Sequence, residues 1–591
     1  MKAVNPFTSQ ISPKLVCATF LILSSVKCLL IPTYRSTDFD VHRNWLAITR
    51  HLPLSEWYFD DVGGTTVHTL DYPPLFAFFE WGLSNNFITD LLLEKGWLDE
   101  RCLELLPDND NEPSDRCVRF QRATVILSDV LLFLGAYLAP VSLGGVYSAS
   151  INNGCGRRSH PWVTFLLIVT NPGLILLDHV HFQYNGMLLG VLLISISFII
   201  WGTQLISAKI TVNRTTDKSN PSDEAIELRS SGLFELLGAG AFAILMAMKH
   251  LYLMLAPLYL FYLLRHHCFV ARRREDYFNY SFSFGRFIVL GIVTLICLLG
   301  AFVPFIMQNQ PRVHMEQILA RLFPFGRGLV HDYWAANVWA LYLFTSRAAS
   351  FLLRKAPIQS GLRQKIESYA IIPFSEPDPS TVAFCLLIGL IPCIISAWKV
   401  GGSSLSQPMT PSSRSSKTNA VDAAEYFIHA VAFSSFSGFM LGYHVHEKAI
   451  MTSIIPLSLL ATTSRENARL FTRTCLFGIF GLLPLLFRTD ELLLKVALFT
   501  SWMSGVIFIL ERIVFKNGKS GQREKGRGLL TAMDKLAVGV LVLLLTFMEI
   551  IHPIKFMPQG KYEFMPLMMT SVFCAMGLLH CWVKSFLQMM S

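Results

Sequence analysis

The sequence predicts an all-α integral membrane protein that crosses the bilayer many times. Of its 591 residues, 52% are hydrophobic and only 15% are charged, which separates it from ordinary soluble domains. Apolar runs of about 20 residues, the length that a helix needs to cross a bilayer, recur from residue 15 to residue 587. A water-soluble fold is therefore excluded.

We expect about 12 to 15 transmembrane helices. The stretch 233–264 is too long for one upright helix and contains Lys249 and His250, so it predicts two short helices that meet at this pair. The clearest apolar runs are 15–33, 124–146, 162–177, 187–208, 286–306, 381–398, 424–443, 469–487, 491–511, 535–552 and 565–587.

The first apolar run, 15–33, predicts an uncleaved transmembrane anchor. It is longer than the core of a signal peptide, and no small-residue cleavage site follows it. Lys2 and Lys14 precede it, so the positive-inside tendency places residues 1–14 in the cytosol. The segment 34–120 then falls on the lumenal side as a catalytic loop. A multi-helix membrane region and a C-terminal tail make up the rest, at 121–587 and 588–591.

The net charge of +9 indicates membrane orientation rather than affinity for nucleic acid. We place the basic clusters at Arg157-Arg158, 272–274 and 516–527 in the cytosol. Glycosylation triplets begin at Asn213 and Asn279, but both flank these clusters, so we interpret them as chance matches. No nucleic-acid partner is expected.

The 12 cysteines indicate neither a zinc site nor a disulfide framework, because most of them lie in or beside apolar runs and none shows CxxC spacing. Cys102 and Cys117 are the exception. They share the lumenal segment, where an oxidising compartment permits a disulfide. Bridged and free forms of this pair both stay open.

A short helix in the membrane interface is predicted directly after the first run. Val41, Trp45, Ile48 and Leu52 recur at helical spacing, which puts Trp45 at headgroup depth, and Pro53 ends the helix. The polar residues lie elsewhere around the helix: Arg43, Asn44 and Arg50.

Two carboxylates, Asp38 and Asp40, stand just before this helix. Asp is among the best helix N-caps, so one interpretation is purely structural. The other is that one carboxylate points into a cavity at the membrane edge and takes a proton from an incoming hydroxyl. Local spacing does not choose between them.

A second acidic and aromatic group closes the same loop at Asp71 and Tyr72. Pro73 and Pro74 prevent a helix from continuing through it and hold the tyrosine ring in one place. The ring is suited to stack on a sugar. It is equally suited to be a rigid start for the apolar stretch that follows.

A third polar group, at 178–185, stands between two strongly apolar runs, where polar side chains are costly unless they face a cavity or one another. By residue type, Asp178, His179 and His181 are a possible metal site. The two-residue spacing of the histidines and the absence of a further ligand at a clear spacing weaken that hypothesis. Hydrogen bonds from Gln183 and Asn185 to sugar hydroxyls fit better.

Two cationic groups are candidates for binding phosphate. His446 and Lys448 both donate hydrogen bonds to phosphate oxygens when charged. The alternative is an ordinary snorkelling lysine that pairs with Glu447. Arg321 and Arg327 lie on a segment stiffened by Pro and Gly, although arginines in such loops also contact lipid headgroups.

Five ordered segments carry a resemblance to a known family: DFDVHRNW at 38–45, LDYPP at 70–74, HFQYN at 181–185, RLFPFGRG at 321–328 and VHEK at 445–448. With them the chain resembles the eukaryotic glucosyltransferases that extend the lipid-linked oligosaccharide with dolichyl phosphate glucose and have the multi-helix GT-C fold. HRNWLAIT at 42–49 is more similar to the enzymes that add the second glucose than to those that add the first, which show Arg-His-Trp-Met-Glu there. Asp40 departs from the family pattern, which has Glu.

The resemblance implies a mechanism. Asp38 matches the general base, which deprotonates the 3-hydroxyl of the terminal glucose while that oxygen attacks C1 of the donor glucose in an inverting α-1,3 transfer. One carboxylate suffices, because phosphate leaves without a general acid, unlike the alcohol in glycoside hydrolysis. The implied substrate-binding residues are Asp40, Arg43, Trp45, Asp71, Tyr72, His181, Gln183, Asn185, Arg321, Arg327, His446 and Lys448.

The resemblance also implies that no cofactor and no metal take part. The sequence contains no Walker A loop and no GxGxxG after a strand, which fits a donor delivered through the bilayer. The expected partners are dolichyl phosphate glucose, the lipid-linked oligosaccharide and membrane lipid. The expected location is the endoplasmic reticulum membrane, with the active site facing the lumen.

Two alternative functions stay open: a sister enzyme that adds the first glucose or uses dolichyl phosphate mannose, and a polyprenyl-lipid transporter or flippase. Polar clusters at the ends of spans, and no matched pair of broken hydrophobic segments, favour an enzyme. Topology leaves one difficulty. When the predicted spans are counted from a lumenal loop at 34–120, the segments 308–334 and 445–448 do not both fall on the lumenal side. Placing both there requires a re-entrant or split helix, or span boundaries different from those predicted.

Overall fold

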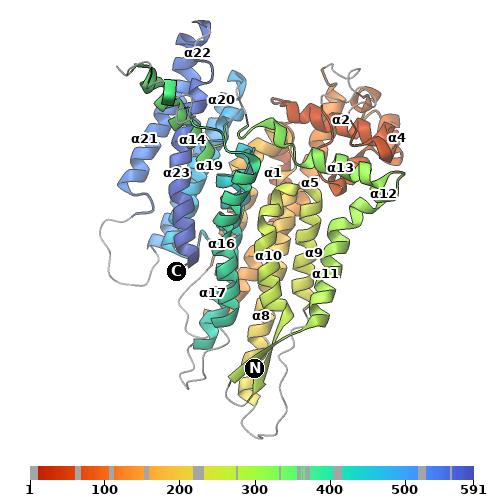
Figure 1. The fold of residues 1–591 in the computed structure, drawn as a ribbon, viewed down its shortest axis with the longest axis vertical. Coiled ribbons are helices and arrows are strands. Elements are labelled where there is room, and N and C mark those ends of the chain that lie inside the picture. Colours follow the sequence, from red (N-terminus) through yellow and green to blue (C-terminus); the bar gives the residue numbers. More distant parts are fainter. Residues whose placement is uncertain are drawn as a thin grey trace. The chain divides into compact units, whose positions relative to one another are not determined.

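The fold is described from a computed structural model (Figure 1). It describes residues 11–59, 68–105, 112–151, 159–216, 232–274, 277–331, 334–355, 361, 364–366, 373–403, 415–486, 488–516, 528–559 and 562–590. Three predictions therefore lie outside the described residues wholly or in large part: the cytosolic N-terminus, the Arg157-Arg158 cluster and the basic stretch 516–527.

The chain divides into two compact units. The first comprises Met1–Pro324 with Ser396–Ile428, and the second comprises Phe325–Ile395 with His429–Ser591. Two helices, α16 (Pro379–Ser403) and α17 (Ser415–Leu441), contribute residues to both units. Each unit is described by itself below.

Helices dominate the first unit. Its elements are α1 (Pro13–Leu29), α2 (Thr37–His51), η1 (Leu54–Glu56), α3 (Pro74–Ser84), α4 (Asn86–Glu94), η2 (Glu100–Leu103), α5 (Asp115–Ile151), α6 (Pro161–Val169), α7 (Pro172–Leu174), η3 (Ile175–Phe182), α8 (Asn185–Thr216), α9 (Leu233–Met248), η4 (His250–Leu255), α10 (Ala256–Leu263), η5 (Leu264–Cys268), β1 (Phe269–Arg274), β2 (Tyr277–Phe282), α11 (Phe284–Leu299), η6 (Gly300–Phe302), α12 (Val303–Ile306) and α13 (Pro311–Leu322).

The second unit is also helical. Its elements are η7 (Phe325–Arg327), α14 (Val338–Lys355), η8 (Glu447–Ile450), α18 (Met451–Leu460), α19 (Arg465–Phe480), η9 (Leu483–Leu485), η10 (Thr489–Glu491), α20 (Leu492–Leu510), η11 (Glu511–Lys516), α21 (Ala532–Thr546), η12 (Phe547–Ile551), α22 (His552–Lys555), η13 (Met557–Gln559) and α23 (Met565–Met590).

Within the described residues, nine helices are long and apolar enough to cross a membrane. The predicted all-α, multi-pass architecture is confirmed. The number is below the expected 12 to 15, partly because some apolar helices are short: α1 has 17 residues and α9 has 16. The predicted break in 233–264 is confirmed, since α9 ends at Met248 and Lys249 has extended φ and ψ before η4 begins.

Three elements were not predicted. The antiparallel hairpin β1–β2 pairs Phe269 with Phe282 and carries the Arg272–Arg274 cluster. Helix α14 falls in a stretch without a clear apolar run. Helix α18 is buried along its whole length but has only ten residues, about half the length that crosses a bilayer.

Helices α5 and α8 lie side by side in the first unit because glycines let their backbones approach (Figure 1). A Cβ added at Gly135 would lie 2.4 Å from the carbonyl oxygen of Gly190, and one added at Gly190 would lie 2.3 Å from that of Leu131. No larger residue fits without moving the helices, which is the usual role of small residues in membrane helix pairs. This contact holds the first turns of α8 against α5.

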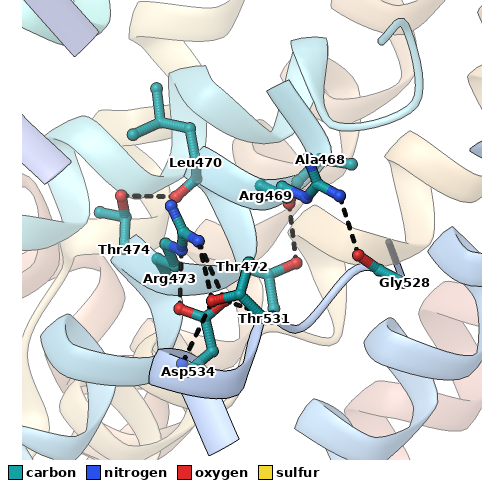
Figure 2. A network of polar contacts seen from close by, with 9 residues as sticks. All are labelled: Ala468, Arg469, Leu470, Thr472, Arg473, Thr474, Gly528, Thr531 and Asp534. Carbon is teal, nitrogen blue, oxygen red and sulfur yellow. Dashed lines mark hydrogen bonds and ion pairs between the residues drawn. The ribbon is translucent and has the colours of Figure 1, made fainter. Parts of the chain in front are cut away.

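In the second unit, an ion pair fastens the beginning of α21 to α19 (Figure 2). Arg473 donates to both carboxylate oxygens of Asp534, at 2.7 and 3.0 Å. Asp534 and Thr531 form a reciprocal capping box at the same helix end. Arg469, one turn earlier in α19, donates to the carbonyl of Gly528 at 2.9 Å. The bidentate geometry makes this contact a specific structural link.

The loop region of the first unit contains the disulfide that the sequence left open. Cys102 and Cys117 are bonded, which ties η2 to the first turn of α5. Helix α2 is present as predicted and stops before Pro53. Its surroundings differ from the prediction, because Arg43 and Asn44 are buried together with Trp45. Protein therefore covers the side of α2 that was expected to be polar.

Candidate active site

Asp38 lies inside the first turn of α2, not at its cap. The N-cap position belongs to Ser36, whose hydroxyl donates to the carbonyl of His181. The structural interpretation of Asp38 as a helix cap is therefore wrong. Its Oδ2 atom instead accepts a hydrogen bond from Nε2 of Gln183 at 2.7 Å and lies 3.2 Å from Nε2 of His181. The carboxylate is 27% exposed, so one part remains open to a substrate.

An unusual turn directs Gln183 toward Asp38. The segment before it, η3, is a π-helix that ends at Phe182. Phe182 has a φ of 82°, a left-handed conformation that is costly for a bulky side chain. Its fully buried ring is held against the rings of Phe39 and His42, with centroids 5.1 and 5.4 Å away. Aromatic packing therefore maintains the strained turn.

Asp178 and Asn185 complete a row of polar side chains behind Gln183. Asp178 accepts hydrogen bonds from the backbone N–H groups of Asn185 and Gly186, at 3.1 and 2.6 Å, and so caps α8. The side-chain nitrogen of Asn185 donates to Asp178 at 3.0 Å and to the side-chain oxygen of Gln183 at 2.8 Å. These residues are all buried.

Tyr72 and Asp71 lie in the same neighbourhood. Burial raises the pKa of the Tyr72 hydroxyl well above its usual value, and the negative charges of Asp71 and Asp38 raise it further. The ammonium group of Lys249 lies over the Tyr72 ring, 4.9 Å from its centroid. Tyr72 also touches Trp45, with centroids 5.1 Å apart. Tyr72 is therefore a buried neighbour of Asp38.

Asp40, in the same first turn of α2 as Asp38, forms an ion pair with Arg43, with 3.5 Å between the charged atoms. Burial raises the pKa of Asp40, and the charge of Arg43 opposes this effect. Burial also lowers the pKa of Arg43, which Asp40 opposes in turn. The Asp40 side chain is 46% exposed while that of Arg43 is 4% exposed. Asp40 is therefore the more accessible partner.

Trp45 holds the loop after α2. Its indole N–H donates to the carbonyl of Thr69 at 3.0 Å, and the ring is 1% exposed. Asn44 donates to the carbonyl of His68 at 2.9 Å in the same way. The structure thus gives Trp45 a supporting position beneath Tyr72 rather than a place on an open surface. A contact of this ring with substrate stays a prediction.

Asp178, His179 and His181, considered together as metal ligands, have different partners. His181 faces Asp38, and Asp178 caps α8. Nε2 of His179 lies 2.9 Å from Oδ2 of Asp129, which also accepts from Lys27 at 2.5 Å. Their arrangement does not converge on one ion.

The sequence analysis did not predict two residues that lie near Asp38. Lys249, noticed only as a helix breaker, reaches the side-chain oxygen of Asn185 at 3.4 Å. Arg122 of α5 donates to the carbonyls of Tyr34, His179 and Val180, at 2.8, 2.6 and 2.8 Å, and so holds the end of η3. A charged residue interrupting an apolar stretch was the available signal for Lys249. No local pattern marks Arg122.

The second unit brings two predicted segments together. The backbone N–H of His444 donates to the carbonyl of Leu329 at 2.9 Å, and its Nδ1 lies 3.1 Å from the carbonyl oxygen of Gly328. The imidazole rings of His331 and His446 lie 4.1 Å apart, centroid to centroid. We call His331, His444, His446, Glu447 and Lys448 the histidine cluster.

The histidine cluster contains groups that suit either a cation or an anion. Ligand atoms of His331, His446 and Glu447 all lie within 4.8 Å of one another, a spacing that a metal ion would accept. With its histidines protonated, the same cluster presents several N–H donors to a phosphate, together with Lys448. Glu447 is buried at 4% exposure.

The two arginines of the segment 321–328 have separate positions, because the boundary between the units falls after Pro324. Arg321 belongs to the first unit, where its Nε donates to the carbonyl of Tyr58 at 3.3 Å. Gln317, one turn earlier, donates to the same carbonyl at 2.9 Å. Arg321 therefore supports the loop at Tyr58, and Arg327 is an exposed residue of the second unit.

Comparison with known proteins identifies the family. The sequence profile of the ALG6, ALG8 glycosyltransferase family matches residues 23–585. The chain belongs to this family. Membership in the ALG6, ALG8 glycosyltransferase family makes it a multi-pass membrane glycosyltransferase, in agreement with the spanning helices.

Curated relatives of the ALG6, ALG8 family are similar over nearly their whole length. One from Arabidopsis thaliana is 32% identical over 579 residues, covering 95% of this chain and 96% of its own. One from Bos taurus is 33% identical over 586 residues, covering 97% and 95%, and one from Mus musculus is 33% identical over 582 residues, covering 96% and 94%. All three are named dolichyl pyrophosphate Glc1Man9GlcNAc2 alpha-1,3-glucosyltransferase.

Proposed function

We propose that this protein transfers glucose from dolichyl phosphate glucose to the terminal glucose of Glc1Man9GlcNAc2-pyrophosphate-dolichol, in α-1,3 linkage. The names of relatives similar over nearly the whole chain support the acceptor. One structural observation carries the chemistry: Asp38 is a partly open carboxylate held by Gln183 at 2.7 Å and His181 at 3.2 Å.

In the proposed reaction, Asp38 takes the proton of the acceptor hydroxyl while that oxygen bonds to C1 of the donor glucose. The bond from C1 to the phosphate oxygen breaks, and dolichyl phosphate leaves with the electron pair. The configuration at C1 inverts from β to α. A positioned base contributes about 10² to 10⁴ in rate. Gln183 and His181 hold the carboxylate oxygen in one place for this step.

We assign phosphate binding to the histidine cluster of the second unit, with His446 and Lys448 as its main contacts. A phosphate carries negative charge and takes several N–H donors, which protonated histidines and lysine supply. Lys448 favours an anion over a metal ion, since its charge repels a cation. Asp40 and Tyr72 remain candidates for contacts with the sugars. The location in this proposal is the endoplasmic reticulum membrane with Asp38 on the lumenal side.

The test uses the purified protein in detergent with synthetic dolichyl phosphate glucose. Two acceptors are compared, the one-glucose and the unglucosylated lipid-linked oligosaccharides, and products are identified by mass spectrometry. Transfer to the one-glucose acceptor, lost in Asp38→Asn, supports the proposal. Transfer only to the unglucosylated acceptor would assign the protein to the first glucose, and movement of lipid without a new glycosidic bond would make it a transporter.

A further inference from the structure

The side-chain nitrogen of Asn185 uses both of its N–H donors within the protein. An asparagine amide has two N–H donors and one carbonyl acceptor. One donor goes to Asp178 and the other to Gln183, at 3.0 and 2.8 Å. The carbonyl accepts from the ammonium of Lys249 at 3.4 Å. Asn185 therefore has no N–H donor left for a sugar hydroxyl, and only its carbonyl oxygen is able to accept from one.

These partners also fix which way the Asn185 amide faces. In the opposite orientation, its oxygen would face the carboxylate of Asp178 and the side-chain oxygen of Gln183. Its NH₂ group would then face the ammonium of Lys249. All three contacts would be repulsive, because Oδ1 of Asp178 already accepts from the backbone N–H of Asn185 and the ammonium of Lys249 offers only donors. These two residues therefore select one orientation.

The orientation of Asn185 in turn decides that of Gln183. Because the Gln183 oxygen accepts from Asn185, its nitrogen must face the other way, where it donates to Asp38 at 2.7 Å. A reversed Gln183 would bring its oxygen against the Asp38 carboxylate. The direction of the Gln183 N–H group that donates to Asp38 is thus set by Asn185.

We propose that Asn185 is a positioning residue for the base, which fixes the Gln183 amide so that it donates to Asp38. The inference rests on the proposed function of Asp38. A donor held on the carboxylate favours its ionised form, the one that accepts a proton. Without the side chain of Asn185, the Gln183 amide is able to rotate. Asp38 then loses the oriented N–H donor that holds its carboxylate in position.

The first experiment measures the protonation of Asp38 without any substrate. A hydrophobic carbodiimide adds to protonated carboxylic acids, so its adduct on Asp38, quantified by peptide mass spectrometry against pH, gives a midpoint. We expect the midpoint to rise by about one pH unit in Asn185→Ala and in the milder Asn185→Ser. The ionisable groups around the site stay unchanged in both variants: His181, Asp71, Tyr72, Lys249 and Asp178.

Ser195→Ala is the matched control. Ser195 lies in the same helix, and its buried hydroxyl donates to the carbonyl of Gly238 at 2.7 Å, outside the row. Its loss removes a buried hydrogen bond from α8 without changing Gln183, so the labelling midpoint should stay as in the unmodified protein. A midpoint unchanged in both Asn185 variants would overturn the inference.

The second experiment uses the transfer reaction and a double variant. If Asn185 acts through Gln183, then Asn185→Ala and Gln183→Ala each lower kcat, and the double variant loses no more than the larger single loss. KM for both substrates should change little. Additive losses, or a rise in KM with kcat unchanged, would make Asn185 a direct substrate contact. If the unmodified protein transfers no glucose, the proposed function fails, while the labelling result still decides the inference.

Discussion

The Asp38 site of the first unit and the histidine cluster of the second hold their reactive groups by different means. Side chains from distant elements hold Asp38: Gln183 donates to it at 2.7 Å, and His181 lies 3.2 Å away. Backbone carbonyls of Gly328 and Leu329 hold His444 in the second unit, and the other rings lie against each other. In the first unit, one carboxylate oxygen has a defined position. In the second unit, several ionisable side chains lie together.

The difference fits what each region is proposed to do. Proton transfer depends on one oxygen at one distance, so a small displacement removes the function. Phosphate binding depends on total positive charge and on several donors, each replaceable in part by the others. We therefore expect single substitutions to abolish activity in the first region and to lower it stepwise in the second.

Asp38→Asn has the largest expected effect. The amide keeps the size of the side chain but does not accept a proton, so transfer should fall by at least about 10². Glucose transfer by purified protein measures this. Asp90→Asn, on an exposed carboxylate of α4, is the control for losing one negative charge. If Asp38→Asn keeps activity within tenfold of the original protein, Asp38 is not the base, and the proposed contrast between the Asp38 site and the histidine cluster fails.

Each substitution in the histidine cluster should lower glucose transfer only in part. His446→Gln and Lys448→Gln are each expected to lower kcat/KM for the donor about tenfold, and the double variant about 10²-fold. Lys535→Gln, at an exposed position of α21, controls for the loss of a positive charge. Unchanged donor kinetics in the double variant would remove the cluster from the phosphate site. A requirement for added divalent metal, lost in His446→Gln, would favour metal binding instead.

The disulfide supports the first region and should affect stability more than chemistry. Cys102→Ser with Cys117→Ser opens a loop of 15 residues, for which chain entropy predicts a loss of about 3 kcal/mol. Thermal unfolding in detergent should show a lower midpoint, and reduction of the original protein should reproduce it. Cys297→Ser, a free thiol in α11, serves as the control. Equal midpoints in all forms would mean that this bridge does not stabilise the loop.

Asp40→Asn has the smallest expected effect, and it depends on pH. Burial raises the pKa of Asp40 above its usual 3.8, so the folded protein holds this proton more tightly than the unfolded chain does. Asp40 therefore contributes stability at low pH that is lost as the pH rises through the folded pKa. The unfolding midpoint of the original protein should fall relative to Asp40→Asn from pH 3.8 upward. A difference in midpoint that does not change with pH would contradict this.

Local sequence signals predicted those parts of the fold that a few neighbouring residues decide. Pro53 ended α2, Lys249 broke 233–264 into α9 and α10, and the prolines after Tyr72 fixed its ring. These outcomes follow from missing N–H donors and from the cost of a charge within an apolar segment. The missed helix α18 shows the limit of this reasoning, because a run of ten residues, seven of them apolar, does not distinguish a buried helix from other structures.

The arrangement around Asp38 was only partly predictable. The sequence named Asp38, His181, Gln183 and Asn185, but not that Gln183 donates to a carboxylate 145 residues earlier. That contact requires the strained Phe182 turn, and it requires Arg122 to hold the end of η3. Both depend on long-range packing, which leaves no period or spacing in the sequence. Residue types predicted the chemistry, and tertiary contacts determined which atoms meet.

The buried contact between Lys27 and Asp129 has a consequence for biogenesis. Lys27 is synthesised 102 residues before its partner, so the growing chain holds a lysine whose carboxylate does not yet exist. Removing one partner of a buried pair costs about 3–5 kcal/mol, so Asp129→Leu should lower the yield of inserted protein. Lys27→Leu in addition should restore that yield in part, because His179 also loses its contact with Asp129. Equal yields would refute this. Helices α1 and α5 therefore reach their final packing together, and α1 does so only after the ribosome has synthesised α5.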